Sequence, residues 1–198
     1  IFQKASTSIE TVLQWPILYY HLPLAWNTFL SYLLVMIFSI MYLKTRDTIW
    51  DLRAQAIAEI GTVFCFLILA TGAIWGNLNW GTPWSWEPRL TSTLILFLIY
   101  LGYFMIRAFG GYYEQASRFA AVVGILAFID VPIIWYAVNM WAPEIQVHPQ
   151  KSIMRSDPTV TWILPVSILS FTLLLFTLYS YRLHAGKLEI KKLEAANE

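Results

Sequence analysis

Residues 75–89 read Trp75-Gly76-Asn77-Leu78-Asn79-Trp80-Gly81-Thr82-Pro83-Trp84-Ser85-Trp86-Glu87-Pro88-Arg89, and this stretch joins two long apolar runs. It holds four tryptophans together with two glycines and two prolines. Indole combines a large flat apolar face with one N–H donor, and glycine lets a backbone approach closely. The stretch therefore fits either a binding surface for a flat aromatic ligand or a tryptophan belt at a membrane–water interface.

The composition around this stretch is that of a membrane protein. The chain has 198 residues, of which 58% are hydrophobic and 13% are charged, against about 25% charged residues in a typical soluble domain. The net charge of +1 offers no basic surface for nucleic acid, so we expect no nucleic-acid partner. Cys65 is the single cysteine, which excludes a disulfide within the chain.

Five apolar runs set the expected fold, near residues 21–43, 57–75, 90–109, 119–140 and 159–181. Each has about 20 residues, enough for a helix to cross a hydrocarbon core of roughly 30 Å. Lipid cannot satisfy backbone polar groups, so helices are expected. We predict an all-α polytopic membrane helix bundle that forms a single integral-membrane domain over residues 1–198. Residues 1–18 are too mixed in polarity to span, and residues 182–198 form a charged tail with a short amphipathic helix.

Lysine and arginine predict the orientation, because these residues favour the cytoplasmic side. Nine of them fall on one side of the predicted spans: Lys44, Arg46, Arg53, Arg107, Arg118, Arg182, Lys187, Lys191 and Lys192. Four fall on the other side: Lys4, Arg89, Lys151 and Arg155. We therefore expect a cytoplasmic C-terminus, with the N-terminus and the tryptophan-rich stretch outside.

Two of the three histidines fall on the same side as the tryptophan-rich stretch. His21 opens the first run and His148 lies in the loop before the last run, whereas His184 lies in the tail, where a structural role is expected. Nine of the ten tryptophans map to this outer side: Trp15, Trp26, Trp75, Trp80, Trp84, Trp86, Trp135, Trp141 and Trp162. An ordinary belt would occupy both interfaces. The asymmetry favours a ligand surface on one face.

Two imidazoles beside a flat aromatic surface suit haem, because neutral imidazole ligates iron at both axial positions. Zinc would need more ligands than this face offers. Cations on the same side could hold haem propionates: Arg89, Lys151 and Arg155. Glu87 could orient a partner or a tryptophan N–H, or it could be a solvated loop acid.

Three polar residues within the runs are expected to have structural roles. Asp130 lies mid-run before Pro132, and an ionised group there is costly, so it should face the bundle. A hydrogen bond to a carbonyl freed by Pro132 is favoured over proton transfer. Glu59 lies near the inner end of its run and needs no special role. Cys65 is expected to pack as a small hydrophobe.

The stretch Trp80-Gly81-Thr82-Pro83-Trp84-Ser85-Trp86-Glu87-Pro88-Arg89-Leu90-Thr91 resembles the WWD signature of haem-handling proteins of cytochrome c maturation. Tyr20-His21-Leu22-Pro23 and Val147-His148-Pro149-Gln150 narrow the resemblance to the CcmC family, over about residues 17–181. Two features depart from the family pattern. The chain shows five runs where the family usually has six spans, which leaves the N-terminal topology open. Its signature has Glu87 where aspartate is common and Pro83 where an aromatic residue is common.

The resemblance implies a site, a cofactor and partners. By this resemblance, His21 and His148 would be the axial ligands of haem b. The signature positions that would hold the porphyrin are Trp80, Gly81, Trp84, Trp86 and Glu87, with Arg89 beside them. The implied partners are the haem chaperone CcmE, the components CcmA, CcmB and CcmD of an ABC-type haem-release complex, and membrane lipid. The implied location is a bacterial-type inner membrane or its organelle equivalent, with the haem site on the outer face.

Three functions are compatible with these residues. The first is haem delivery with no bond-making of its own, so that no catalytic residue is expected. The second is an enzyme, a cytochrome c haem lyase, which normally goes with extra histidines in the membrane. The third is a b-type electron carrier, which usually holds its histidines within helices. The predicted spans hold no histidine except His21 at the outer end of the first, which favours delivery.

Overall fold

The computed structural model describes residues 2–140 and 158–196, and helices joined by short connections make up its regular secondary structure over those residues. Its elements are α1 (Phe2–Thr45), α2 (Thr48–Trp80), α3 (Pro88–Phe109), α4 (Tyr113–Ala127), α5 (Asp130–Met140) and α6 (Pro158–Ala196). Within the described part of the chain, five helical segments are long and apolar enough to cross a membrane. The predicted all-α bundle with five spans is confirmed, and the protein is an integral membrane protein.

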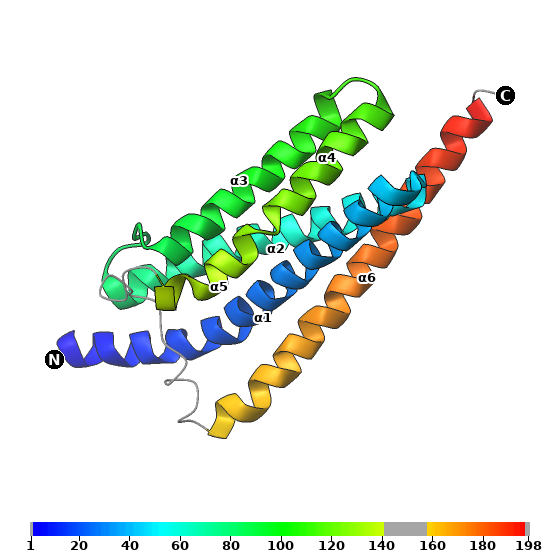
Figure 1. Ribbon diagram of the computed structural model, residues 1–198. Coiled ribbons are helices and arrows are strands. Elements are labelled where there is room, and N and C mark those ends of the chain that lie inside the picture. Colours follow the sequence, from blue (N-terminus) through cyan, green and yellow to red (C-terminus); the bar gives the residue numbers. More distant parts are fainter. Residues whose placement is uncertain (1, 141–157, 197–198) are drawn as a thin grey trace.

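The five spans run up and down alternately, with α4 and α5 following one another in the same direction as one span (Figure 1). We call the end that holds the α2–α3 connection, residues 81–87, the tryptophan end. The α1–α2 and α3–α4 connections and the C-terminus lie at the other end, and the N-terminus lies at the tryptophan end (Figure 1). The two termini therefore lie at opposite ends, as an odd number of spans requires.

Several helices are longer than their apolar runs. The helix α1 begins at Phe2, and its span-length apolar part begins at Pro16, five residues before the predicted start. The tryptophan-rich stretch is not wholly a loop, because Trp75 to Trp80 form the last turns of α2. The last span and the tail form one helix, α6, where we expected a separate short helix. Helical hydrogen bonds continue past the apolar core wherever no glycine or proline stops them.

The fourth run is divided into α4 and α5 rather than forming one helix. Pro132 has no N–H, and its ring would clash with the carbonyl of Phe128 four residues earlier in a regular helix. Before the proline the backbone forms tighter turns. The Phe128 amide donates a hydrogen bond to the Ile125 carbonyl, and the Ile129 amide donates one to the Leu126 carbonyl. The break lets α5 take its own direction at the tryptophan end (Figure 1).

The core lies between α1 and α2, with α3 and α4 against them. A Cβ atom on Gly61 of α2 would lie 2.6 Å from Ser31 Cβ, so the absence of a side chain lets α1 and α2 approach closely. Beside this contact Tyr32 of α1 stacks on Tyr100 of α3, with ring centroids 3.7 Å apart. Cys65 is fully buried here, which confirms the expectation that it packs as a small hydrophobe.

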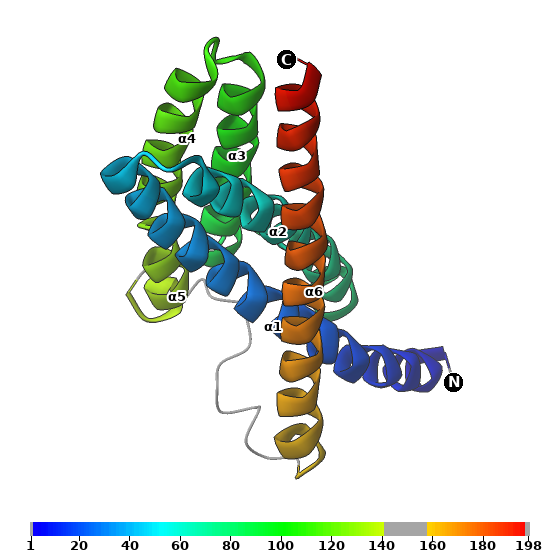
Figure 2. The same ribbon diagram turned by 90° about the vertical axis from the view of Figure 1, so that its right-hand side faces the viewer.

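The helix α6 lies along one side of α1 and α2 and is the least buried span (Figure 2). Leu175 is its fully buried contact, and Phe171 packs edge-on against Tyr20 with ring centroids 6.2 Å apart. Large apolar side chains cover its remaining surface, including Trp162, Leu169 and Leu173. Such a surface suits lipid, which solvates apolar side chains as well as protein does.

Candidate functional site: a histidine pocket at the tryptophan end

A cavity of about 370 Å³ opens at the tryptophan end between α1, α2, α3, α5 and α6. Its size lies within the range of about 300–1,000 Å³ that is typical of small-molecule sites. The walls are mainly leucine, isoleucine, phenylalanine and indole, with few polar groups. Four of the sequence-predicted site residues line it, namely His21, Trp80, Trp84 and Arg89. We refer to this cavity as the histidine pocket.

His21 reaches the pocket from α1 and is held by α2. Its Nδ1 lies 2.9 Å from the hydroxyl oxygen of Thr71. That hydroxyl also lies 2.7 Å from the carbonyl of Leu67, to which it can donate. When the Thr71 proton is used on Leu67, Nδ1 is the donor to Thr71 and Nε2 keeps a lone pair, which is the form in which imidazole binds a metal.

Gly72, next to Thr71, makes room for the imidazole ring. A Cβ atom at this position would lie 3.3 Å from Cε1 of His21, tighter than nearly all real Cβ contacts. The ring thus lies directly over the α2 backbone. The sequence analysis did not single out Thr71 or Gly72. In the sequence, only their position at the outer end of the second run connected Thr71 and Gly72 with the site. Their contact with His21 could not be predicted, because His21 and Thr71 are 50 residues apart in the chain.

Tryptophans from the end of α2 form one wall of the pocket. Trp75 and Trp80 meet edge to face, with ring centroids 5.2 Å apart. Gly76 permits this arrangement, because a Cβ atom there would lie 3.1 Å from the Trp80 ring. Gly81 then ends α2 with a left-handed φ of 70°, a conformation that favours glycine. Trp80 lines the pocket as predicted, and Gly81 shapes the turn that follows.

The tryptophans of the α2–α3 connection differ in their placement. Trp84 lines the histidine pocket, and its Nε1 is buried without a hydrogen-bond partner among the described residues. Trp86 packs edge-on against Trp84, with ring centroids 5.7 Å apart, but 76% of its surface is exposed and it does not line the pocket. The pocket therefore has one buried indole donor, from Trp84, that its own walls leave unused.

Glu87 and Arg89 lie at the start of α3. Glu87 is the N-cap residue and only 1% of its surface is exposed, so the alternative of a solvated loop acid is wrong. Arg89 lines the pocket and reaches α5, where Nε lies 3.4 Å from the Ile134 carbonyl and Nη2 lies 3.5 Å from the Trp135 carbonyl. Its guanidinium places a cation in a wall that is otherwise apolar.

Other sequence-predicted residues fall away from the pocket or outside the described residues. His148, Lys151 and Arg155 belong to the segment 141–157, which lies outside the described residues. His184 is exposed on the distal part of α6, as expected for a structural histidine. Asp130 lies at the start of α5, and its Oδ2 is buried without a hydrogen bond to the described residues. The Oδ2 atom therefore does not make the predicted hydrogen bond to a freed carbonyl among the described residues.

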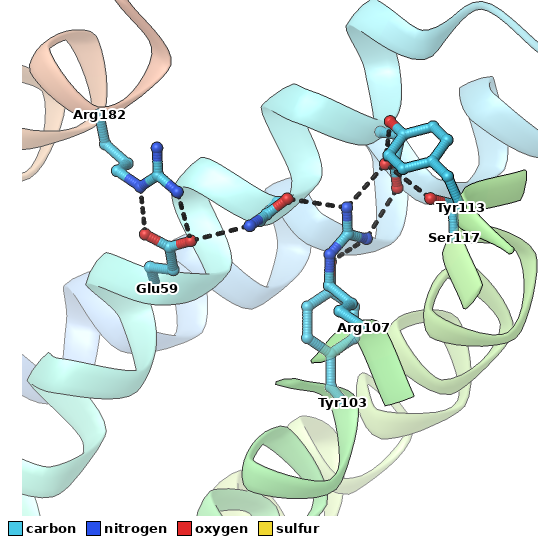
Figure 3. Close-up of polar contacts among 8 residues, drawn as sticks. Glu59, Tyr103, Arg107, Tyr113, Ser117 and Arg182 are labelled. Atoms are coloured by element: carbon cyan, nitrogen blue, oxygen red, sulfur yellow. Dashed lines mark hydrogen bonds and ion pairs between the residues drawn. The ribbon is translucent and has the colours of Figure 1, made fainter. Parts of the chain in front are cut away.

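A polar network that the sequence analysis missed lies at the end opposite the histidine pocket (Figure 3). Arg107 of α3 forms an ion pair with Asp51 of α2, and Asp51 also accepts hydrogen bonds from Tyr113 and Ser117 of α4. Glu59 binds Arg182 of α6, so the expectation that Glu59 has no special role is corrected. These charges were visible in the sequence, but their pairing joins separate helices.

Comparison with known proteins gives the family. The family model described as "Heme exporter protein C" (CcmC) matches residues 2–197. "Heme exporter protein C" of Bradyrhizobium diazoefficiens is 38% identical over 157 residues, which cover 78% of this chain and 59% of that protein. The protein of the same name from Escherichia coli K12 is 34% identical over 157 residues, which cover 78% of this chain and 63% of that protein.

A ccmC-like mitochondrial protein of Marchantia polymorpha, named for cytochrome c biosynthesis, is 35% identical over 155 residues, covering 77% of this chain and 64% of that protein. In all three cases the alignment covers less than two thirds of the relative. The match to the family model nevertheless extends over nearly the whole chain, and it includes the tryptophan stretch and His21. The chain therefore belongs to the CcmC family, "Heme exporter protein C".

Proposed function

We propose that this protein binds haem b in the histidine pocket and passes it on for cytochrome c biogenesis. The observation that carries the proposal is the placement of His21 in an apolar, tryptophan-walled cavity, with Nδ1 held by Thr71. The names of the relatives supply the class of cargo and the pathway.

The chemistry of the pocket suits a haem. The porphyrin face is flat and apolar, and the walls offer indole and aliphatic surfaces that exclude water from it. Haem iron takes neutral imidazole as an axial ligand, which His21 supplies from Nε2. The Trp84 N–H and the Arg89 guanidinium are donors of the kind that propionate oxygens accept. His148 is proposed as the second axial ligand.

We further propose that haem is held at the outer leaflet and transferred to a soluble haem chaperone, CcmE. The bias of positive charge toward the opposite end supports an outer location for the tryptophan end, and residues 81–83 of the α2–α3 connection are exposed. A partner could dock over this connection beside the pocket. CcmA, CcmB and CcmD are the proposed neighbours in the membrane. In this scheme the protein binds and releases haem and makes no bond in the porphyrin.

Haem ligation is tested by His21→Gly and His148→Gly, with His184→Gly as the matched control. Each variant is purified in detergent, and haem content and the Soret band are measured with and without added imidazole. We expect both the His21→Gly and the His148→Gly variants to lose haem or change the band, and imidazole to restore part of the signal by filling the space left at iron. The control should match the parent protein. Unchanged spectra for His21→Gly would show that the histidine pocket is not the haem site.

Delivery is tested separately, by a photo-crosslinking amino acid at Pro83 in cells with normal or restricted haem supply. The control position is Tyr112, which is 86% exposed at the opposite end of the bundle. We expect haem-dependent crosslinks to a soluble outer-face haem chaperone from position 83 and none from position 112. Capture of cytoplasmic partners alone from position 83 would contradict the proposed orientation.

A further inference from the structure

We propose that Thr71 is a positioning residue that selects the tautomer of His21 and thereby presents Nε2 to haem iron. This inference rests on the proposed function, since it concerns how the proposed ligand is prepared. The two contacts that carry it are the hydrogen bond between His21 Nδ1 and Thr71 Oγ1 and the bond from Thr71 to the α2 backbone.

The direction of the first bond follows from the second. A threonine hydroxyl has one proton, and at Thr71 that proton points to the Leu67 carbonyl at 2.7 Å, with the Ile68 carbonyl at 3.2 Å on the same side. The oxygen lone pairs remain, and one of them faces His21 Nδ1 at 2.9 Å. With the Thr71 proton on Leu67, an unprotonated Nδ1 would set two lone pairs against each other, so this arrangement favours a proton on Nδ1.

The imidazole has little freedom to avoid this contact. Its Cε1 edge lies over Gly72, where even a methyl group would be 3.3 Å away. Turning Nδ1 away from Thr71 would give up the 2.9 Å hydrogen bond that holds the ring. Free imidazole side chains prefer the tautomer with the proton on Nε2, which cannot bind iron through Nε2. Thr71 therefore reverses the ordinary preference before haem arrives.

Partners of this kind orient a metal-binding histidine and fix its tautomer, and their loss typically lowers metal affinity by about tenfold to a hundredfold. In most such sites the partner is a carboxylate or a carbonyl. A threonine hydroxyl carries no charge, so it fixes the tautomer without strengthening the ligand as a carboxylate would. A neutral partner also avoids placing a buried acid within a membrane span.

The test measures the tautomer directly, by ¹⁵N NMR of histidine-labelled protein without haem in lipid nanodiscs. The chain has three histidines, and the signal that disappears in His21→Gly identifies His21. We expect the parent protein to carry the proton on Nδ1. Thr71→Val removes the hydroxyl at nearly equal volume and should move the proton to Nε2, whereas Thr71→Ser should keep it on Nδ1. Thr177→Val on α6, which loses the same kind of backbone bond, is the control.

Haem titration of the same variants measures how the tautomer of His21 affects haem affinity. Thr71→Val should bind haem about tenfold to a hundredfold more weakly than the parent, and Thr71→Ser and Thr177→Val should bind as the parent does. A parent protein with the proton on Nε2, or a Thr71→Val variant with an unchanged tautomer, would overturn the inference. If His21→Gly retains haem while Thr71→Val still shifts the tautomer, the proposed function fails and the tautomer assignment stands.

Discussion

The guanidinium of Arg107 donates two hydrogen bonds to the carboxylate of Asp51, with Nη1–Oδ1 at 2.8 Å and Nη2–Oδ2 at 2.6 Å. The pair joins α3 to α2 and is nearly enclosed, since 10% of the Arg107 side chain and 2% of the Asp51 side chain are exposed. The hydroxyl groups of Tyr113 and Ser117 of α4 also donate hydrogen bonds to Asp51. Three helices thus meet at one carboxylate, at the end opposite the histidine pocket.

Removing the charge of Asp51 should destabilise the bundle strongly. Asp51→Asn leaves the Arg107 cation buried without its counter-ion, and losing one partner of a buried pair costs about 3–5 kcal/mol. The measurement is an SDS unfolding titration followed by circular dichroism. Glu114→Gln is the control, because its pair with Arg118 is exposed and should be worth less than about 1 kcal/mol. Similar small losses in both variants would contradict a stabilising role for the Asp51 network.

The Glu59–Arg182 pair should act locally, on the attachment of α6. The Arg182 Nε lies 2.5 Å from Glu59 Oε2, but the two side chains are 27% and 29% exposed, so solvent weakens the pair. We expect Glu59→Gln to change the free energy of unfolding by no more than about 1 kcal/mol. Hydrogen exchange of residues 182–196 should nevertheless become faster. The double variant Glu59→Arg/Arg182→Glu should exchange as slowly as the parent protein, and unchanged exchange in Glu59→Gln would rule out this anchor.

Gly72→Ala should displace His21. The new methyl group would lie 3.3 Å from the imidazole, so the ring must move by a few tenths of an ångström. We expect weaker haem binding and an altered Soret band while the protein still inserts into the membrane. Gly102→Ala on α3 is the matched control, because a Cβ atom there meets nothing within 4 Å. Equal haem binding in the two variants would show that His21 is not seated against Gly72 when haem is bound.

Trp84→Phe removes the indole N–H but keeps an aromatic ring, so it should distinguish the contribution of the hydrogen-bond donor to haem binding from that of aromatic packing. If the buried Trp84 N–H bonds to a haem propionate, its loss should weaken haem binding by about 1.5–3 kcal/mol, the range for hydrogen bonds to charged groups. Trp86→Phe is the comparison, since Trp86 is largely exposed and does not line the pocket. Titrations with haem and with a haem dimethyl ester, which lacks the charged propionates, would show whether the loss of binding depends on those groups. A loss that is equal for both ligands would assign Trp84 a packing role only.

Much of the architecture could be predicted from the amino-acid sequence. The helical class and the five spans follow from apolar runs of sufficient length, and those predictions are confirmed. The boundaries were less accurate, because hydropathy marks the apolar part of a helix and not its hydrogen-bonded ends. The break before Pro132 was signalled by the proline itself, although the single run concealed it.

The candidate site was predictable in part. His21, Trp80, Trp84 and Arg89 were selected from residue type and predicted side, and the structure brings them to one pocket. The assignment of haem to them stays a prediction, as does the role of His148. Trp86 shows the limit of a motif, since it shares the signature with Trp84 but lies outside the pocket wall. A motif gives the spacing along the chain but not the direction in which each side chain points.

The sequence by itself determined that this chain crosses a membrane as helices, because a hydrocarbon layer of about 30 Å admits only long apolar segments with internally bonded backbones. It also determined which residue types gather at each end. Only the tertiary structure decided that Thr71 meets His21 and that Asp51 meets Arg107. Such contacts depend on the rotation of each helix about its axis. Close packing sets that rotation, as at Gly61 and at the Tyr32–Tyr100 stack, and the hydropathy of a single helix does not contain it.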